Sequence, residues 1–323
     1  MFAKLLRSVV IGLIVAGLLL AALPMLRSSN GLFAEKTENT SDETPVSYNK
    51  AVRRAAPAVV NIYNRNLNGA ANVLSLGSGV IMNERGYIIT NRHVIKDAQQ
   101  ITVVLQDGRR YEALLVGSDG LTDLAVLKID PGNLPVIPTN KNRVAHVGDV
   151  VLAIGNPYNL GQTVTQGILS ATGRISMSTT GRQTFLQTDA SINRGNSGGA
   201  LVNSLGELIG INTLTYDKIT DGETPEGLGF AIPIELATKI MDKLIRDGRV
   251  IRGYFGIQGK EIIPLRPSNS GIDRLQGIIV TEITPNGPAS NAGFQINDII
   301  INVDNKPAVS VLETMDQVAE IRP

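Results

Sequence analysis

Cysteine and tryptophan are both absent from this chain of 323 residues, and aromatic residues make up only 4% of it. The lack of cysteine excludes disulfide bonds, thiolate catalysis and cysteine metal sites together. Aromatic residues are too scarce to form a platform on which bases could stack. The net charge of +1, without long basic runs, also argues against nucleic acid as a partner. No metal ion or other cofactor is expected.

Histidine is scarce too, since the chain contains only His93 and His146. His93 closes an apolar segment that begins at Gly86 and runs into a turn. Side chains at such strand ends project from a rigid element into a cleft, where catalytic groups often lie. His146 lies in a polar turn before a strand and is interpreted as a surface residue. His93 is therefore the candidate base.

A glycine-rich loop at residues 195–199, with the sequence Gly-Asn-Ser-Gly-Gly, is the most informative stretch. Glycine adopts backbone angles that other residues avoid and lets another backbone approach closely. Ser197 in such a turn can expose its hydroxyl while neighbouring N–H groups point at one place, which is the geometry that acyl transfer needs. A plain hairpin between two strands is the alternative.

Asp123 is the candidate carboxylate, although the chain contains 29 acidic residues. It precedes the apolar segment 124–129, and an aspartate at the mouth of such a strand can be partly buried and fix an imidazole tautomer. A turn residue that begins the strand is the alternative. The three candidates fall in the order His93, Asp123, Ser197, which is the chymotrypsin order of the catalytic triad.

Three short segments resemble the signatures of the HtrA (Deg) family of serine proteases. They are Thr-Asn-Arg-His-Val at 90–94, Thr-Asp-Leu-Ala-Val at 122–126 and the glycine-rich loop at 195–199. The similarity covers nearly everything after residue 47. It implies a serine endopeptidase in which the serine attacks the scissile carbonyl, the histidine transfers the proton and the aspartate orients the imidazole.

The resemblance also implies an oxyanion hole and a specificity pocket. The oxyanion hole is expected from the backbone of Gly195, Asn196 and Ser197, and the pocket is expected to be lined by Ile192. Asp189 lies eight residues before the serine, whereas the pocket charge of trypsin-like enzymes lies six before. A small neutral or apolar substrate side chain is therefore favoured.

Two series of short apolar segments, separated by polar and glycine-containing turns, predict a mainly β protein. The first series comprises residues 58–63, 77–82, 87–90, 101–105, 111–116 and 124–129, and the second comprises 150–154, 163–171, 184–188, 200–202, 208–214 and 229–232. Two such sets suit a chymotrypsin-like double β-barrel with the triad at its seam. Helices are expected at 48–55 and, with an apolar stripe, at 233–247.

The N-terminal region predicts a membrane anchor. Residues 8–26 carry no charge, and about 19 residues in a helix span roughly 29 Å, enough for a bilayer core. Lys4 and Arg7 precede this run, which predicts a cytoplasmic N-terminus. A cleaved signal peptide is the alternative. The polar segment that follows predicts a flexible tether.

The last part of the chain resembles a bacterial PDZ domain, on the order of the segments 253–259, 277–283, 285–293 and 297–303. Peptide-carboxylate binding is assigned by this resemblance to Tyr254, Phe255, Gly256 and Ile257, opposite a helix at 312–319. The domain is expected to be incomplete at its C-terminal end. The predicted organisation is a cytoplasmic N-terminus (1–7), a transmembrane signal anchor (8–27), a tether (28–46), a trypsin-like serine protease domain (47–249) and a PDZ domain (250–323).

Within the family, the single anchor and the run 151–161 resemble the stress-sensing proteases of the bacterial inner membrane. That resemblance implies a single-pass inner-membrane protein with periplasmic protease and PDZ domains, and a homotrimer. It implies a transmembrane anti-sigma factor as substrate and C-terminal peptides of misfolded outer-membrane proteins as activators. It also implies a sensor loop at 173–182 that includes Arg174. A broad-specificity quality-control protease with chaperone activity and a peptide-binding scaffold without catalysis are the alternatives.

Overall fold

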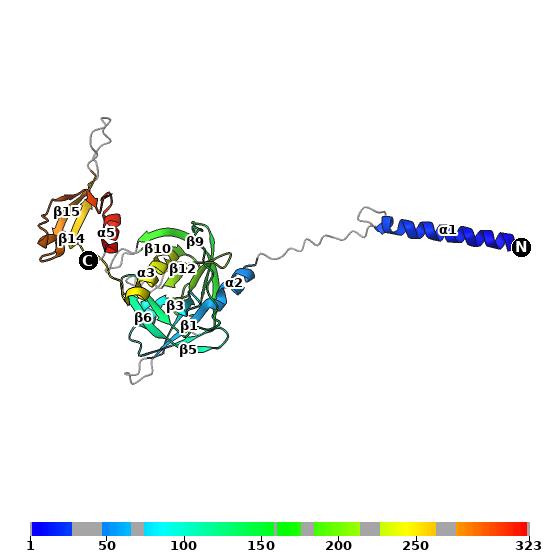
Figure 1. The fold of residues 1–323 in the computed structure, drawn as a ribbon, viewed down its shortest axis with the longest axis horizontal. Coiled ribbons are helices and arrows are strands. Elements are labelled where there is room, and N and C mark those ends of the chain that lie inside the picture. Colours follow the sequence, from blue (N-terminus) through cyan, green and yellow to red (C-terminus); the bar gives the residue numbers. More distant parts are fainter. Residues whose placement is uncertain are drawn as a thin grey trace, which may run out of the picture. The chain divides into compact units, whose positions relative to one another are not determined.

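The computed structural model describes residues 2–27, 47–65, 74–157, 160–175, 184–213, 227–262 and 276–321. The chain divides into two compact units, residues 1–49 and 50–323. The helices are α1 (Phe2–Arg27), α2 (Asn49–Ala55), α3 (Ile234–Asp247), α4 (Pro288–Asn291) and α5 (Val311–Glu320), with short 3₁₀ turns η1 (Ala56–Ala58) and η2 (Arg92–Ile95). Figure 1 shows these elements along the chain.

Helix α1 contains the predicted anchor and begins earlier than expected, at Phe2. Its window Phe2–Leu19 has a mean hydropathy of 2.1 and is not buried by any part of the protein. The length and composition of this window are sufficient to cross a bilayer. The expected tether at residues 28–46 lies outside the described residues.

The first half of the protease region forms one antiparallel sheet of seven strands in the order β5-β4-β1-β2-β3-β7-β6. The strands are β1 (Val59–Arg65), β2 (Leu74–Ile81), β3 (Tyr87–Asn91), β4 (Gln100–Val104), β5 (Arg110–Glu112), β6 (Leu114–Asp119) and β7 (Leu124–Lys128). Its core contains Ile62, Ile88, Val103 and Leu127, all with an exposed fraction of 0%.

Two details of this sheet differ from the prediction. The single strand expected at 111–116 is two strands, because the buried Ala113 donates its N–H to the Ile101 carbonyl while the chain passes from β5 to β6. These two strands are also the edges of the sheet, and no ladder between them is formed among the described residues. Within the described part of the chain, the first barrel is thus connected at its edge by the turn between β5 and β6, without a hydrogen-bonded ladder between these two strands.

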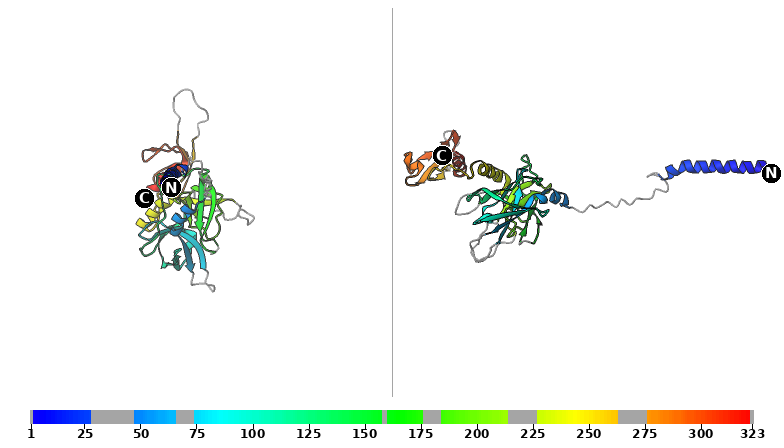
Figure 2. Two further views of the ribbon diagram at one scale, coloured as in Figure 1. Left: turned by 90° about the vertical axis from the view of Figure 1, so that its right-hand side faces the viewer. Right: turned by 60° about the horizontal axis from the view of Figure 1, so that its bottom comes forward.

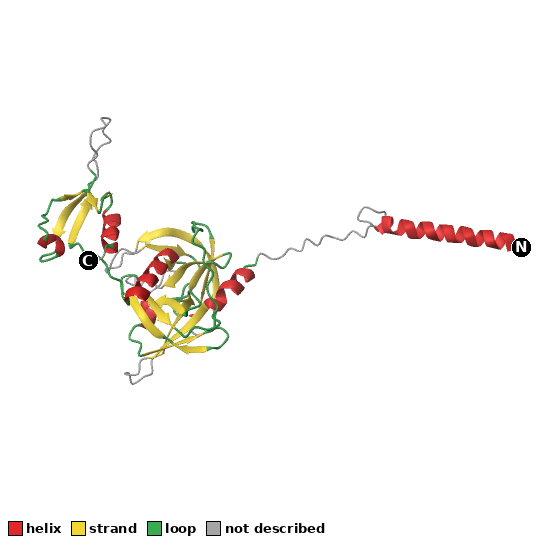
Figure 3. Ribbon diagram, viewed as in Figure 1, coloured by secondary structure: helices red, strands yellow, loops and turns green. Residues whose placement is uncertain are grey.

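The second half forms a closed six-stranded barrel in the order β10-β13-β12-β11-β8-β9, as predicted (Figures 2 and 3). Its strands are β8 (Val150–Gly155), β9 (Thr163–Ile175), β10 (Thr184–Thr188), β11 (Ala200–Asn203), β12 (Leu208–Thr213) and β13 (Gly229–Pro233). Residues from all six strands or their ends fill the interior, among them Val151, Leu169, Leu186, Leu201 and Ile209.

Helix α3 follows the barrel and packs against strands of both sheets. Its buried face consists of Ala237, Ile240, Met241 and Leu244, as the predicted stripe requires. Gly248 ends the helix with φ of 70° and donates its N–H to the Leu244 carbonyl, a left-handed cap that glycine adopts without steric cost.

The C-terminal region has its own small core. A three-stranded sheet has the order β14-β15-β16, and β17 pairs with β18. These strands are β14 (Ile257–Glu261), β15 (Ile278–Ile283), β16 (Ile299–Ile300), β17 (Asn302–Val303) and β18 (Lys306–Pro307). Phe255 and Phe294 meet edge to face in this core, with ring centroids 5.0 Å apart. Helix α5 matches the helix expected at 312–319.

Candidate active site

The loop between β10 and β11 carries Ser197, whose exposed fraction is only 2%. Gly198 follows with φ of 80°, and a Cβ atom there would collide with the Ser78 carbonyl oxygen and the Thr90 hydroxyl. The glycine is therefore needed both for its backbone angle and because strands β2 and β3 approach the loop closely. The serine loop of the barrel is thereby pressed against the first sheet.

His93 lies in turn η2, directly after β3. The buried side chain of Asn64 on β1 donates hydrogen bonds to the carbonyl oxygens of Val94 and Lys96 at 3.3 and 3.1 Å. These bonds hold the backbone on the C-terminal side of His93. The imidazole keeps a side-chain exposure of 41%, so it remains open to a substrate.

Asp123 meets His93 through both carboxylate oxygens. The distance from His93 Nδ1 to Asp123 Oδ2 is 2.6 Å, and the His93 N–H donates to Oδ1 at 3.0 Å. The Asp123 carbonyl oxygen accepts from the Arg92 N–H and from the Asn91 side-chain amide at 2.9 and 3.1 Å. These four contacts hold Asp123 at φ of 53°, a left-handed conformation that is uncommon outside glycine.

The structure thus brings His93 and Asp123 together, and the hydrogen bond between them is at Nδ1, as expected for the predicted pair. Ser197 Oγ has no hydrogen-bond partner among the described residues, so it is not bonded to His93. Catalytic hydrogen bonds are often loose before substrate binds and tighten in the complex. His146 is exposed, as predicted, and takes no part in this cluster.

Two of the three N–H groups expected to hold an oxyanion are available. Gly195 and Ser197 are buried, and within the described ranges neither N–H has an acceptor. The Asn196 N–H differs, because it donates to the Asn193 carbonyl oxygen at 2.9 Å. Asn196 therefore contributes its position in the loop and no free donor.

Ile192, the predicted specificity residue, is half-buried and packs on the barrel core, and its side chain lies against Gly229. Asp189 is exposed, and its carboxylate accepts a hydrogen bond from the backbone N–H of Ile168 in β9 at 2.7 Å. This arrangement agrees with an apolar pocket wall without the acidic group of a trypsin-like pocket.

The structure shows contacts to the candidate site from three residues that the sequence did not indicate, namely Asn64, Asn91 and Ser78. Each lies within or at the end of a strand, and each contacts the active site through bonds to residues 30 or more positions away. A single polar residue in a strand has no local pattern that would distinguish it, so nothing short of the tertiary contacts could reveal these roles.

The predicted peptide-binding segment lies at the start of β14, which is an edge strand of its sheet within the described residues. Tyr254 is exposed and its hydroxyl lies 2.9 Å from Thr284 Oγ1. Phe255 is packed in the core, while Gly256, at φ of 82°, leads into Ile257. An edge strand of this kind can accept one further strand from a peptide.

Arg174 does not lie in a loop, because β9 continues to Ile175. Its Nε donates to the Gln187 side-chain oxygen on β10 at 3.1 Å, so it does reach a neighbouring element. The strand register places Arg174 opposite Phe185. The rest of the predicted sensor loop, residues 176–182, lies outside the described residues.

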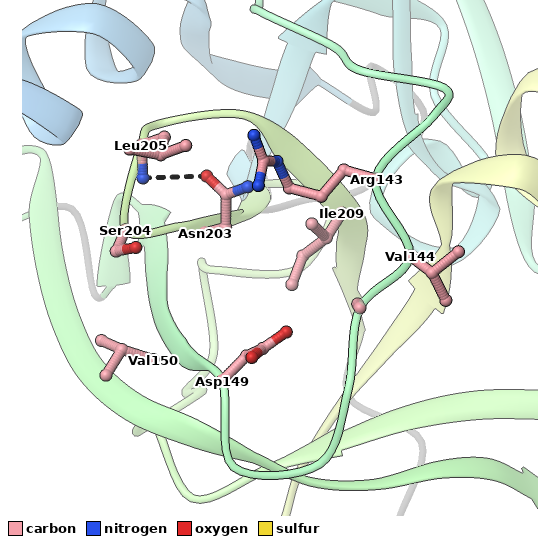
Figure 4. A pocket seen from close by; sticks show the side chains of 9 residues that line it. Arg143, Val144, Asp149, Val150, Asn203, Ser204, Leu205 and Ile209 are labelled. Carbon is pink, nitrogen blue, oxygen red and sulfur yellow. Dashed lines mark hydrogen bonds between the residues drawn. The ribbon is translucent and has the colours of Figure 1, made fainter.

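A pocket of about 130 Å³ lies elsewhere, between the segment before β8 and the β11–β12 hairpin (Figure 4). Arg143, Asp149, Asn203 and Ile209 are among the residues that line it. A neighbouring hollow reaches Glu207, whose pKa is lowered by hydrogen bonds from Asn203 and Asn140 and by the Arg143 charge, against the opposing effect of burial. None of the predicted catalytic residues lines either hollow.

Residues 77–211 match the family described as trypsin-like peptidase domain, and residues 244–323 match the PDZ domain family. The chain is 72% identical over 328 residues to serine endoprotease DegS of Escherichia coli (strain K12), covering 100% of this chain and 92% of that protein. A crystal structure of the serine endoprotease from Yersinia pestis is similar with a TM-score of 0.72 and 66% identity, over 86% of this chain and 90% of that one. The HtrA-type protease AlgW with a tripeptide is similar with a TM-score of 0.76 and 47% identity, over 86% and 89%.

Proposed function

Because the chain belongs to the HtrA family of serine endoproteases and is of the DegS type, we propose that Ser197, His93 and Asp123 are its catalytic triad. The chain is a membrane-anchored periplasmic serine endoprotease. The full-length similarity to DegS does not favour the broad-specificity alternative. The observation that carries the triad assignment is the 2.6 Å contact of His93 Nδ1 with Asp123, together with Ser197 in a glycine-rich loop that packs against β2 and β3.

In this mechanism Ser197 Oγ attacks the scissile carbonyl carbon while His93 Nε2 takes its proton. Asp123 fixes the tautomer in which Nδ1 carries a proton and stabilises the imidazolium that forms. The same imidazolium then gives its proton to the leaving amine. A water molecule, deprotonated by His93, then attacks the acyl-enzyme in the same way, which releases the second product and restores Ser197.

The oxyanion of each tetrahedral intermediate is held by the N–H groups of Gly195 and Ser197. Donors already aimed at the developing charge need no reorganisation during the reaction, and each is worth about 10²–10³ in kcat. Ile192 forms a wall of the pocket for the substrate side chain before the scissile bond.

The finer parts of the proposal concern topology and partners. Residues 1–7 are cytoplasmic, 8–27 span the inner membrane, 28–46 are a tether, and the protease (47–249) and PDZ (250–323) domains are periplasmic. The active form is a homotrimer. The substrate is a transmembrane anti-sigma factor, and C-terminal peptides of misfolded outer-membrane proteins bind at Tyr254–Ile257 and activate the enzyme. The tripeptide in the AlgW structure supports peptide binding by such proteases.

The test is the cleavage of unfolded casein by the detergent-purified chain, with and without a peptide that ends in an apolar residue and a free carboxylate. A regulated protease cleaves almost no casein until the peptide is added, and its Ser197→Ala variant cleaves none in either condition. Digestion without peptide would contradict the regulated form. Digestion by the Ser197→Ala variant would contradict the triad.

A further inference from the structure

One buried residue outside the proposed triad contacts the serine loop through both its side chain and its backbone. Ser78 lies in β2 with an exposed fraction of 0%. Its hydroxyl donates to the Gly195 carbonyl oxygen at 2.7 Å and accepts from the Asn156 N–H at 3.0 Å. Its own N–H donates to the Ser197 carbonyl oxygen at 2.9 Å. Ser78 thus joins the first sheet to two segments of the barrel.

Ser78 is itself held in place from the strand beside it. The Thr90 hydroxyl on β3 donates to the Ser78 carbonyl oxygen at 2.7 Å, and Thr90 is fully buried. The strand register pairs Ser78 with Asn61 on β1. Its hydroxyl is therefore presented to the serine loop from the middle of a three-stranded segment, which moves less than a loop does.

The two carbonyl groups that Ser78 binds belong to the two residues whose N–H groups form the oxyanion hole. The Gly195 carbonyl shares a peptide plane with the Asn196 N–H, and this plane lies between the planes that carry the Gly195 and Ser197 N–H groups. Holding the carbonyl therefore restrains the plane that links the two donors. Gly195 has φ of 105°, a conformation that glycine reaches easily because it has no Cβ. The same freedom lets its backbone move unless a neighbour restrains it. Ser78 supplies that restraint at the Gly195 carbonyl through its hydroxyl and at the Ser197 carbonyl through its N–H.

We propose that Ser78 is a positioning residue for the oxyanion hole: its hydroxyl holds the Gly195 carbonyl, its N–H holds the Ser197 carbonyl, and together they fix the peptide planes next to those of the Gly195 and Ser197 donors. This role rests on the proposed function of Ser197 and the loop around it. Replacing Ser78 with alanine leaves the buried Gly195 carbonyl without its donor, and a buried group without a partner drives local rearrangement. The donors remain in the chain but are no longer prealigned.

The experiment compares Ser78→Ala with the wild type in the full-length protein. We expect kcat to fall about 10- to 100-fold with KM within twofold, less than the 10²–10³ for deleting a donor outright. Two inhibitors of the same sequence separate positioning from general damage. A peptide boronate places a tetrahedral oxygen in the oxyanion hole, whereas the matching carboxamide only fills the substrate pockets. The boronate should lose affinity by the same factor as kcat, and the carboxamide should not.

Val103→Ala is the matched control, because Val103 is buried in the core of the same sheet and its strand partners are Ile62 and Tyr111. It should lower the melting temperature but leave kcat and the affinity ratio of the two inhibitors unchanged. Ser78→Thr keeps the hydroxyl and should recover most of the lost kcat. If Ser78→Ala does not fold, Ser78→Cys, with a weak donor of similar size, should show the same selective loss.

Equal weakening of both inhibitors, or Ser78→Ala behaving like Val103→Ala, would overturn the positioning role. Ser197→Ala in the same assays distinguishes this failure from a wrong active site. If Ser197→Ala still turns over substrate, the proposed function itself is wrong. If it is inactive while Ser78→Ala matches the core control, only the role of Ser78 is wrong.

Discussion

At the scale of single residues, Asp123 shows how the fold prepares a catalytic group. Its left-handed backbone costs energy, and contacts to three consecutive residues, 91–93, offset that cost. Asp123→Asn keeps the shape but presents the wrong hydrogen-bond pattern to His93 Nδ1. We expect kcat to fall by about 10⁴ with the melting temperature nearly unchanged. Asp119→Asn is the comparison, and a larger loss of kcat there would mean that the carboxylate was misassigned.

The nucleophile gives a second prediction at this scale. Ser197→Ala removes the only atom that can attack the carbonyl, so we expect kcat to fall by about 10⁶, as with triad deletions in another serine protease. Circular dichroism and the melting temperature should match those of the wild type, because the hydroxyl makes no hydrogen bond within the described structure. Proteolysis within tenfold of the wild type would exclude Ser197 as the nucleophile.

Asp119 has a different role, and its charge state predicts a pH dependence of stability. Both its oxygens accept hydrogen bonds from Arg252 at 2.7 Å, and its side-chain exposure is 8%. Burial alone would raise the pKa of Asp119, but the bonds from Arg252 and Thr122 outweigh burial, so the pKa lies below its ordinary value. Stabilisation by this carboxylate is therefore complete above the unfolded value of about 4 and is lost as pH falls through the lower folded value.

We expect Arg252→Ala to lower the free energy of unfolding at pH 7 by about 3 kcal/mol, because it leaves a buried charge unpaired. Urea denaturation should show that this difference shrinks as pH falls below about 4 and through the lower folded pKa of Asp119, because the carboxyl becomes protonated. Arg246→Ala is the control, since Arg246 is exposed and an ion pair at the surface such as that with Asp247 contributes little to stability. A difference between Arg252→Ala and wild type that stays constant with pH would contradict the assignment.

The sequence indicated the residues of the proposed triad because two features narrowed the choice of candidates. Only two histidines were available, and the single hydroxyl of the loop at 195–199 lay among three glycines. Asn64, Asn91 and Ser78 could not be found in the same way. Their functions lie in hydrogen bonds to distant residues, and one polar residue in a strand is locally indistinguishable from any other.

At the scale of elements, helix α3 connects both sheets through one buried face. Leu244 is completely buried, and it lies against the position of Gly117 on β6. Leu244→Ala leaves a cavity, so we expect a loss of about 2–5 kcal/mol in the free energy of unfolding. Asp242→Ala, on the exposed face of the same helix, should change it by less than about 0.5 kcal/mol. Equal effects of the two variants would contradict this packing.

Helix α1 gives a prediction about topology. Lys4 and Arg7 lie in its first turns, and basic residues stay on the cytoplasmic side of an anchor. A reporter fused after Asn49 should be extracytoplasmic and should remain in the membrane through alkaline extraction. Recovery of the reporter in the soluble fraction would favour the alternative, a cleaved signal peptide.

Strand positions were predictable to within a few residues because apolar runs alternate with glycine-containing and polar turns. The division of residues 111–116 into β5 and β6 was not, since Leu114 and Leu115 are exposed apolar residues that continue the run. Which of the two predicted barrels closes by hydrogen bonds was also beyond the sequence. The closed barrel includes pairs between strands far apart in the chain, β10 with β13 and β11 with β8, whereas the neighbouring strands β5 and β6 form no ladder among the described residues.

At the scale of the whole molecule, the helix beside the predicted peptide site is tied to the protease region. Glu320, at the end of α5, forms ion pairs with Lys239 and Lys243 of α3 at 2.9 Å. At the other end of α5, the Val311 N–H donates to Glu261 on β14 at 3.0 Å. A peptide strand added beside β14 would therefore contact an element that is linked through ionic and hydrogen bonds to the protease core.

Gating by the PDZ domain requires that a peptide bind the active state more tightly than the inactive one, because equal affinity for both states shifts nothing. A coupling of about 1–3 kcal/mol corresponds to roughly 5- to 150-fold activation. We expect a peptide ending in an apolar residue to raise the cleavage rate of the intact chain within this range. A chain ending at Arg249 should ignore the peptide and be more active than the intact chain without it, since the restraint is gone. If the intact enzyme ignores the peptide and the shortened chain is no more active, the PDZ domain does not restrain the active site, and its edge strand serves some other ligand.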